Sequence, residues 1–295
     1  MAKCILVTGA TGFIGQNLTK LLLDLDFKVI ALVRASSRNK SFIKETKKKN
    51  RKFYPIYFKD IKSLPNKLSN IKINYVINLA TKWVDKHNYN DLINIINCNI
   101  LFTTAVLDSV SKKNLKKFIN ISTYALFKDS KKKYNPFNLY GATKKGFEDI
   151  IEFYKNNYKK TYFYNLYLYD SYGKKDSRNK IIAKILKDYE SNKITTILSS
   201  KVELNLLNVK EICEALVLTL RKKIKSGNYL IKAKNFTNIL NLIKQTNIRL
   251  NKKIKFKLLN KSVRKKIDFR MNLLPHWRPK SSIEKDIYNL LNGNN

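Results

Sequence analysis

The sequence predicts an α/β protein with a Rossmann-type, doubly wound parallel sheet and a smaller C-terminal lobe. Over the first two-thirds of the chain, short β-branched runs alternate with longer amphipathic stretches, as in successive βαβ units. A glycine-rich turn directly follows the first of these runs and opens a helix. After about Tyr172 the alternation loosens. We therefore expect a first domain over residues 1–172 and a smaller lobe over 173–295 that is interleaved with it.

The individual elements follow from the same pattern. The strands expected in the sheet and the second lobe are Cys4–Thr8, Lys28–Val33, Phe53–Phe58, Tyr75–Leu79, Lys117–Ser122, Thr161–Tyr167, Tyr229–Ile231 and Ile254–Leu258. The expected helices are Phe13–Leu25, Asn90–Ser111, Tyr140–Asn156, Asn179–Ser191, Val209–Lys223, Thr237–Thr246 and Ser281–Leu291.

The composition is that of a globular protein with an extreme positive charge. Of 295 residues, 44% are hydrophobic, enough for a full α/β core. The formal net charge of +39 indicates either a polyanionic partner or a drift in composition. Lysine outnumbers arginine 51 to 9 and is spread along the chain, whereas a protein that grips phosphates is expected to use more arginine. We therefore favour drift and expect no nucleic-acid partner.

Cysteine usage and hydropathy indicate a cytoplasmic protein. Cys4, Cys98 and Cys213 are widely spaced and form no CxxC pair, so we expect free thiols. The apolar run at the N-terminus is too short for a signal sequence. We also find no long uncharged apolar run further on, and we expect no membrane span.

The glycine-rich turn predicts a dinucleotide site. Gly9, Gly12 and Gly15 have the spacing GxxGxxG between a strand and a helix. Glycines let the backbone approach a pyrophosphate, and the helix start directs free N–H groups at the anion. We expect cofactor contacts from the three glycines and from Thr11, Phe13 and Ile14.

The end of the second strand indicates which dinucleotide is bound. NAD-preferring sites place an acid here for the ribose 2′-hydroxyl, whereas arginine suits a 2′-phosphate. The residue present is Arg34, with Arg38 close behind. NADP is therefore favoured over NAD.

A YxxxK pair forms the candidate catalytic centre. Tyr140 and Lys144 are four residues apart at an expected helix start, so their side chains share one face. A nearby ammonium is expected to lower the phenol pKa towards the working range. Ser122 and Thr123 lie at the carboxyl edge of the sheet, where open α/β sheets bind ligands.

The order of glycine turn, strand-end hydroxyls and YxxxK resembles that of extended short-chain dehydrogenases/reductases of the nucleotide-sugar epimerase/dehydratase superfamily. Further matches are Asp60-Ile61, Asn78-Leu79-Ala80, Asn99, Tyr172-Gly173 and Trp277-Arg278-Pro279.

The resemblance implies roles for these residues. Thr123 would be the catalytic hydroxyl, with Ser122 as runner-up, Tyr140 the acid–base group, and Lys144 a ligand of the nicotinamide ribose. Additional cofactor contacts would come from Asp60, Ile61, Leu79, Ala80, Asn99 and Ser122, and substrate contacts from Thr81, Asp170 and Arg178. Family members often dimerise through a four-helix bundle, here built from Asn90–Ser111 and Tyr140–Asn156.

Departures from the family pattern narrow the choice among the reactions that family members catalyse. Dehydratases carry Asp-Glu after the catalytic threonine, where this chain has Tyr124-Ala125. Leu204 stands where the family often has a diphosphate-binding arginine. The remaining set suits NAD(P)H-dependent reduction of a nucleotide-linked 4-keto-6-deoxysugar. A 4-epimerase with tightly bound NAD and a non-catalytic nucleotide- or RNA-binding scaffold stay open as alternatives.

Overall fold

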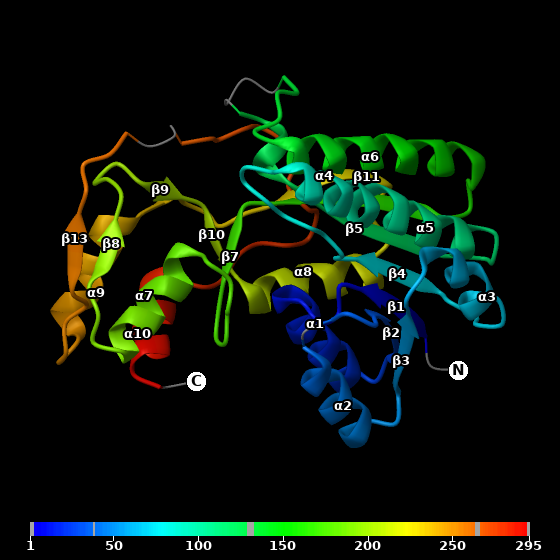
Figure 1. The fold of residues 1–295 in the computed structure, drawn as a ribbon, viewed down its shortest axis with the longest axis horizontal. Helices are drawn as coiled ribbons and strands as arrows, with labels where there is room; N and C mark the ends of the chain where they lie inside the picture. The colour runs from blue at the N-terminus through cyan, green and yellow to red at the C-terminus, as the bar shows by residue number, and fades with distance from the viewer. Residues whose placement is uncertain (1–2, 38, 129–132, 263–265, 294–295) are drawn as a thin grey trace.

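A seven-stranded sheet, in which every strand pairs in parallel with its neighbours, forms the centre of the larger part of the protein (Figure 1). The structure is a computed structural model and describes residues 3–37, 39–128, 133–262 and 266–293, so that Arg38 lies outside the described residues. In the spatial order β11-β6-β5-β4-β1-β2-β3, the strands are Gly227–Ile231, Tyr162–Leu168, Lys117–Thr123, Tyr75–Asn78, Cys4–Thr8, Lys28–Arg34 and Phe53–Phe58.

Helices cover both faces of this sheet, which confirms the doubly wound fold. In β1, Ile5 and Val7 lie in one core, whereas Cys4 and Leu6 lie in the other, since successive side chains of a strand point to opposite faces. The first face is covered by α1 (Phe13–Asp24), α2 (Lys40–Lys49) and α8 (Val209–Arg221), and the second by η1 (Ile61–Ser63), α3 (Leu64–Leu68), α5 (Thr103–Ser111) and α6 (Leu139–Asn157).

A row of polar side chains, buried except at Asn228, crosses five strands of the sheet in register. The Thr8 hydroxyl donates to Asn78, Asn78 to Asn120, Asn120 to Asn165 and Asn165 to Asn228, at 2.7, 3.0, 2.9 and 3.0 Å. Each pair is also a backbone partner in the ladder of neighbouring strands. Because a one-residue slip would leave buried amides without partners, this asparagine row specifies the register of the sheet.

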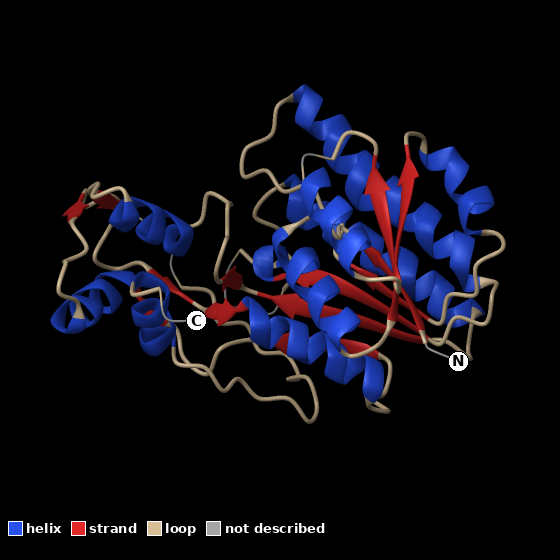
Figure 2. Ribbon diagram, turned by 90° about the horizontal axis from the view of Figure 1, so that it is seen from below, coloured by secondary structure: helices blue, strands red, loops and turns tan. Residues whose placement is uncertain are grey.

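A smaller lobe with its own core lies beside the sheet (Figures 1 and 2). Its helices are α7 (Ile181–Glu190), α9 (Ile239–Arg249) and α10 (Ile283–Leu291). Three two-stranded sheets accompany them: β10–β7 (Leu206–Asn208 with Asp170–Tyr172), β12–β9 (Thr237–Asn238 with Glu203–Leu204) and β13–β8 (Phe256–Leu258 with Thr195–Ile197). The chain returns to the main sheet through β11. The division at residue 172 stays a prediction.

The helical stretch Tyr89–Ser111 is more apolar than we expected. It comprises α4 (Tyr89–Ile96), the π-helical segment η2 (Asn97–Phe102) and α5, and it is long and apolar enough, by length and composition only, to cross a membrane. In the fold, the stretch lies beside α6 in the helix layer on the second face of the sheet (Figure 1). Its side chains Phe102, Val106, Leu107 and Val110 pack into the core there.

Candidate active site

The glycine turn joins β1 to α1 in the form that a dinucleotide requires. Gly9 has a φ of 66°, and a Cβ on it would lie 2.8 Å from the backbone nitrogen of Ala80. A Cβ on Gly15 would lie 2.1 Å from the carbonyl oxygen of Gly9. The helix begins at Phe13 with no side-chain cap and no acidic residue in its first turn, so its N–H groups are open to an anion.

A cavity of about 980 Å³ opens above this turn. Sixteen of the residues predicted to contact cofactor or substrate line it: Gly9, Thr11, Gly12, Phe13, Ile14, Gly15, Arg34, Ile61, Leu79, Ala80, Thr81, Ser122, Thr123, Tyr140, Asp170 and Arg178. Its volume and the glycine cradle fit a nicotinamide dinucleotide together with a substrate. The residues present therefore fit the cofactor that the sequence predicts.

The end of the cavity where the sequence predicts the adenosine lies at the carboxyl end of β2. Arg34 is exposed there, and Ser37 and Asn39 contact Thr11 of the glycine turn. Asp60 is exposed, caps η1 by accepting a hydrogen bond from the Lys62 N–H, and does not line the cavity, although its neighbour Ile61 does. The adenine contact predicted for Asp60 therefore stays a prediction.

The structure brings the candidate catalytic hydroxyls together. The side chains of Thr123, on β5, and Thr81, in the loop after β4, lie close enough to the Tyr140 hydroxyl to lower its pKa, and all three residues line the cavity. Thr123 also accepts a hydrogen bond from the Ala125 N–H at 3.1 Å, which fixes its rotamer. A carbonyl oxygen at this point would meet the phenol and a threonine hydroxyl together.

Asn99 supports this arrangement from behind the cavity wall. It is 2% exposed and lies in the π-helical segment. Its side-chain oxygen accepts hydrogen bonds from the Thr81 hydroxyl and the Lys82 N–H, and its amide donates to the Thr143 hydroxyl at 3.0 Å. Asn99 thus ties the loop after β4 to α6, and holds Thr81 and Tyr140 in reach of each other.

Ser122 points to a different partner from Thr123. Its hydroxyl donates to the buried carboxylate of Glu148, one turn beyond Lys144 on α6. The geometry therefore favours Thr123 over Ser122 as the hydroxyl that would face a reacting carbonyl. Glu148 was missed in the sequence, because its only signal is spacing on a helix.

Burial changes the expected ionisation of the pair. It raises the pKa of Tyr140 above its usual value, although hydrogen bonds from Thr123 and Thr81 oppose the change. Burial also lowers the pKa of Lys144 to about 8, against the attraction of Glu148. The sequence led us to expect a phenol pKa lowered by the ammonium and by the nicotinamide ring, whereas in the structure burial raises the pKa of Tyr140.

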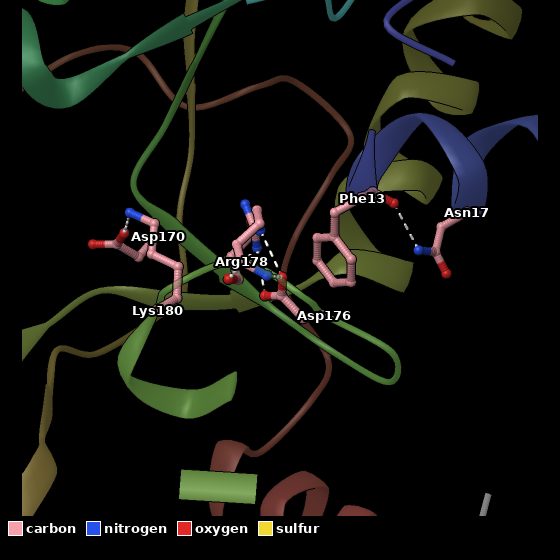
Figure 3. Close-up of polar contacts among 7 residues, drawn as sticks. Phe13, Asn17, Asp170, Asp176, Arg178 and Lys180 are labelled. Atoms are coloured by element: carbon pink, nitrogen blue, oxygen red, sulfur yellow. Dashed lines mark hydrogen bonds and ion pairs between the residues drawn. The ribbon is translucent and has the colours of Figure 1, made fainter. Parts of the chain in front are cut away.

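One wall of the cavity is formed around Asp170, a predicted substrate contact, which lies beside Lys180 (Figure 3). Asp170 is paired with Lys180 at 2.7 Å, and the Lys180 ammonium lies 5.1 Å from the ring centroid of Trp83. Tyr124 stacks on Tyr169 and its hydroxyl lies 3.4 Å from Asp170. Where a dehydratase would carry an acidic pair, this chain has an aromatic wall and an ion pair.

Arg178 lies between this wall and the glycine turn (Figure 3). Its guanidinium lies 4.3 Å from the ring centroid of Phe13 and forms a two-bonded ion pair with Asp176 and further bonds to Ser171 (Figure 3). Its Nε and Nη2 donors are therefore engaged by protein groups, and the contact with Phe13 places it beside the start of α1. The substrate contact predicted for it stays a prediction.

The comparisons with known proteins agree with this geometry. The family model described as "NAD dependent epimerase/dehydratase family" matches residues 5–231. CDP-abequose synthase from Yersinia pseudotuberculosis is 31% identical over 213 residues, which are 72% of this chain and 71% of that protein. CDP-abequose synthase from Salmonella muenchen is 26% identical over 77% of this chain and 73% of its own.

Solved structures share the fold over nearly the whole chain. UDP-glucuronic acid 4-epimerase from Bacillus cereus, in complex with NAD, has a TM-score of 0.83 at 22% identity and covers 98% of both chains. UDP-glucose 4-epimerase from Thermotoga maritima has a TM-score of 0.80 at 21% identity and covers 98% of this chain and 97% of its own.

The fold and the site together define a nicotinamide-dependent oxidoreductase of nucleotide sugars. The chain belongs to the NAD dependent epimerase/dehydratase family, within the extended short-chain dehydrogenases/reductases.

Proposed function

We propose that the protein is an NADP-dependent 4-ketoreductase of a nucleotide-linked 4-keto-6-deoxysugar, acting in the biosynthesis of a surface-polysaccharide sugar. The observation that carries this proposal is that Tyr140, Thr123 and Thr81 come together in the wall of a cavity above the glycine turn. The similarity to CDP-abequose synthases supports the same class of substrate.

In this proposal the chain moves a proton while the cofactor supplies a hydride. The raised pKa of Tyr140 keeps the phenol protonated at neutral pH, as a proton donor requires. Thr123 donates a hydrogen bond to the carbonyl oxygen, and Tyr140 gives that oxygen its proton. Lys144 stabilises the phenolate left behind and holds the nicotinamide ribose.

The choice of NADP rests on the end of β2. Arg34 lines the cavity there with Ser36, Ser37 and Lys20, a basic and hydroxyl-rich set for a 2′-phosphate. We propose cofactor contacts from the glycine turn, Arg34, Asp60, Ile61, Leu79 and Ala80, and substrate contacts from Thr81, Asp170 and Arg178. An Arg34→Ala variant is expected to raise KM for NADPH about tenfold and to leave that for NADH unchanged.

The test is incubation with NADPH and a panel of nucleotide 4-ketosugars, with products identified by mass and NMR. Tyr140→Phe should lower kcat by about 100-fold or more and leave NADPH affinity unchanged. The proposal fails if every 4-ketosugar in the panel is left unreduced.

A 4-epimerase is the second candidate, since the Thr123–Tyr140–Lys144 set serves both reactions. Tightly bound NAD in freshly purified protein, with interconversion of 4-epimers and no net use of NADPH, would favour it. The non-catalytic scaffold would instead show salt-dependent RNA binding that Tyr140→Phe leaves intact.

We also propose a cytoplasmic homodimer. The three cysteines are free. Apolar side chains are exposed along α4, η2 and the adjacent face of α6, where a four-helix bundle would bury them: Tyr89, Leu92, Ile93, Ile96, Leu101 and Phe153. Phe153, 62% exposed, is the point to probe. Phe153→Glu should convert a dimer to a monomer in light scattering, whereas an unchanged mass would reject this interface.

A further inference from the structure

A buried carboxylate lies directly beneath the candidate catalytic pair and has no part in the proton transfer described above. Glu148 is on α6, one turn after Lys144 and two turns after Tyr140, and is 6% exposed. One of its oxygens accepts a hydrogen bond from the Ser122 hydroxyl of β5, and the other from the Tyr167 hydroxyl of β6 at 2.6 Å. Both oxygens are thus held by neutral donors from two strands.

This bonding pattern suits a carboxylate, because an ionised acid offers an acceptor oxygen to each of the two hydroxyls. Burial raises the pKa of Glu148, whereas the hydrogen bonds from Ser122 and Tyr167 and the charge of Lys144 oppose this change. A glutamine of the same shape would direct its NH₂ group at one of the hydroxyls. The carboxyl group of Glu148 is therefore fixed in direction by β5 and β6.

The foremost charge that acts on this carboxylate is that of Lys144. The two side chains are i and i+4 on one helix, which places them on the same face, and Lys144 is 4% exposed. The other groups that act on the pair are Lys145 on α6, Cys98 on η2 and Asp149 beyond Tyr167. Lys145 and Asp149 pair with each other at the surface, so they largely cancel.

We propose that Glu148 is a positioning residue: its carboxylate, held by Ser122 and Tyr167, keeps Lys144 protonated and aligned beneath Tyr140. The inference rests on the proposed function only in that Lys144 assists proton transfer by Tyr140. Burial lowers the pKa of Lys144, and Glu148 is the foremost group that opposes this change. The buried carboxylate thus sets the upper pH at which the site can work.

Glu148→Gln removes the charge and keeps the shape, and the pKa of Lys144 is the direct measurement. It can be followed by NMR of protein labelled at lysine Cε, with the signal assigned by Lys144→Met. We expect the Lys144 pKa to fall by about one unit, as for loss of one nearby opposite charge. Glu152→Gln is the matched control, since Glu152 lies one turn further on the same helix but is exposed and paired with Lys155.

The pH profile of kcat gives the second measurement. Its upper limb should move to lower pH by the same amount in Glu148→Gln and stay in place in Glu152→Gln, with NADPH affinity at pH 6.5 unchanged in both. A Lys144 pKa equal to that of the wild type in Glu148→Gln would overturn the inference. A shifted Lys144 pKa in a protein that reduces no ketosugar would instead leave the inference standing and refute the proposed function.

Glu148→Asp covers the case in which the glutamine variant does not fold. It keeps the charge but withdraws it by one methylene from Lys144, so the Lys144 pKa should fall by less than in Glu148→Gln. The same value as in the wild type would again overturn the inference.

Discussion

The asparagine row across the sheet can be broken at its centre, and the size of the effect follows from the bonds involved. Asn120 is fully buried, donates to Asn165 and accepts from Asn78. In Asn120→Leu the branching and the number of heavy atoms are kept, but an amide N–H of Asn78 and an amide oxygen of Asn165 lose their partners. Each unsatisfied buried group costs about 1–3 kcal/mol, so we expect a loss of roughly 2–4 kcal/mol in the free energy of unfolding.

Urea denaturation followed by circular dichroism measures this loss, and Asn228→Ala is its control. Asn228 closes the row on the edge strand β11 and is exposed, so water replaces its bond and the expected loss is below about 1 kcal/mol. The double variant Asn120→Leu with Asn165→Leu removes both partners of one bond and should cost less than the sum of the single losses.

The result that refutes this reasoning is an Asn120→Leu variant no less stable than Asn228→Ala.

The row also reaches the cofactor cavity, because the Thr8 hydroxyl accepts hydrogen bonds from the N–H groups of Leu79 and Ala80 at 3.2 and 3.1 Å. Loss of register at Asn120 should therefore weaken NADPH binding as well as stability, and the two losses should appear in the same variant.

Three further predictions follow from the described contacts. Gly15→Ala should abolish NADPH binding in a fluorescence titration while the far-ultraviolet spectrum is kept, since its Cβ would clash with the Gly9 carbonyl; unchanged affinity would show that the turn relaxes freely. Lys117→Met should cost about 2–3 kcal/mol in urea, because the buried ammonium donates to three carbonyls at the end of α8; exposed Lys116→Met should cost nothing measurable. Burial raises the pKa of Tyr164, Tyr167 and Tyr172, so these phenols keep their protons above pH 10 only when folded, and stability should fall as pH rises through 10; a flat stability between pH 9 and 11 would contradict this.

The sequence pattern within a short segment was enough to predict the strands and helices that the segment itself determines. The strand Cys4–Thr8 and the helix start at Phe13 lie where the sequence placed them, because a fully buried strand and a glycine turn each leave a strong signal. The helices α2 and α3 were missed. Only Ile43 of α2 is buried, and α3 is five residues long, so neither shows a clear apolar period.

The candidate site likewise has one part that the sequence predicts and another part that it does not. The glycine turn and the Tyr140–Lys144 pair are motifs within one element, and the sequence reveals them. The contacts of Glu148 with Tyr167 and of Lys180 with Trp83 join segments that are distant along the chain, and no spacing rule connects such residues. Only the packing of α6 on the sheet and of the lobe on the cavity brings them together.

Positive charge predominates in the lining of the cavity, which composition alone did not predict. The basic residues that line it outnumber the acidic ones eight to two: Lys20, Arg34, Lys59, Lys82, Lys174, Lys175, Arg178 and Lys180 against Asp85 and Asp170. A dinucleotide and a nucleotide sugar are both anions, and a cleft lined by one sign of charge concentrates ligands of the other. Leu204 cannot bind a diphosphate through two hydrogen bonds, as an arginine would. The positive potential of the cavity attracts a diphosphate without such a residue. A compositional drift towards lysine is therefore compatible with a cavity that binds anions. Each lysine near the cavity adds to the attraction of an anionic ligand.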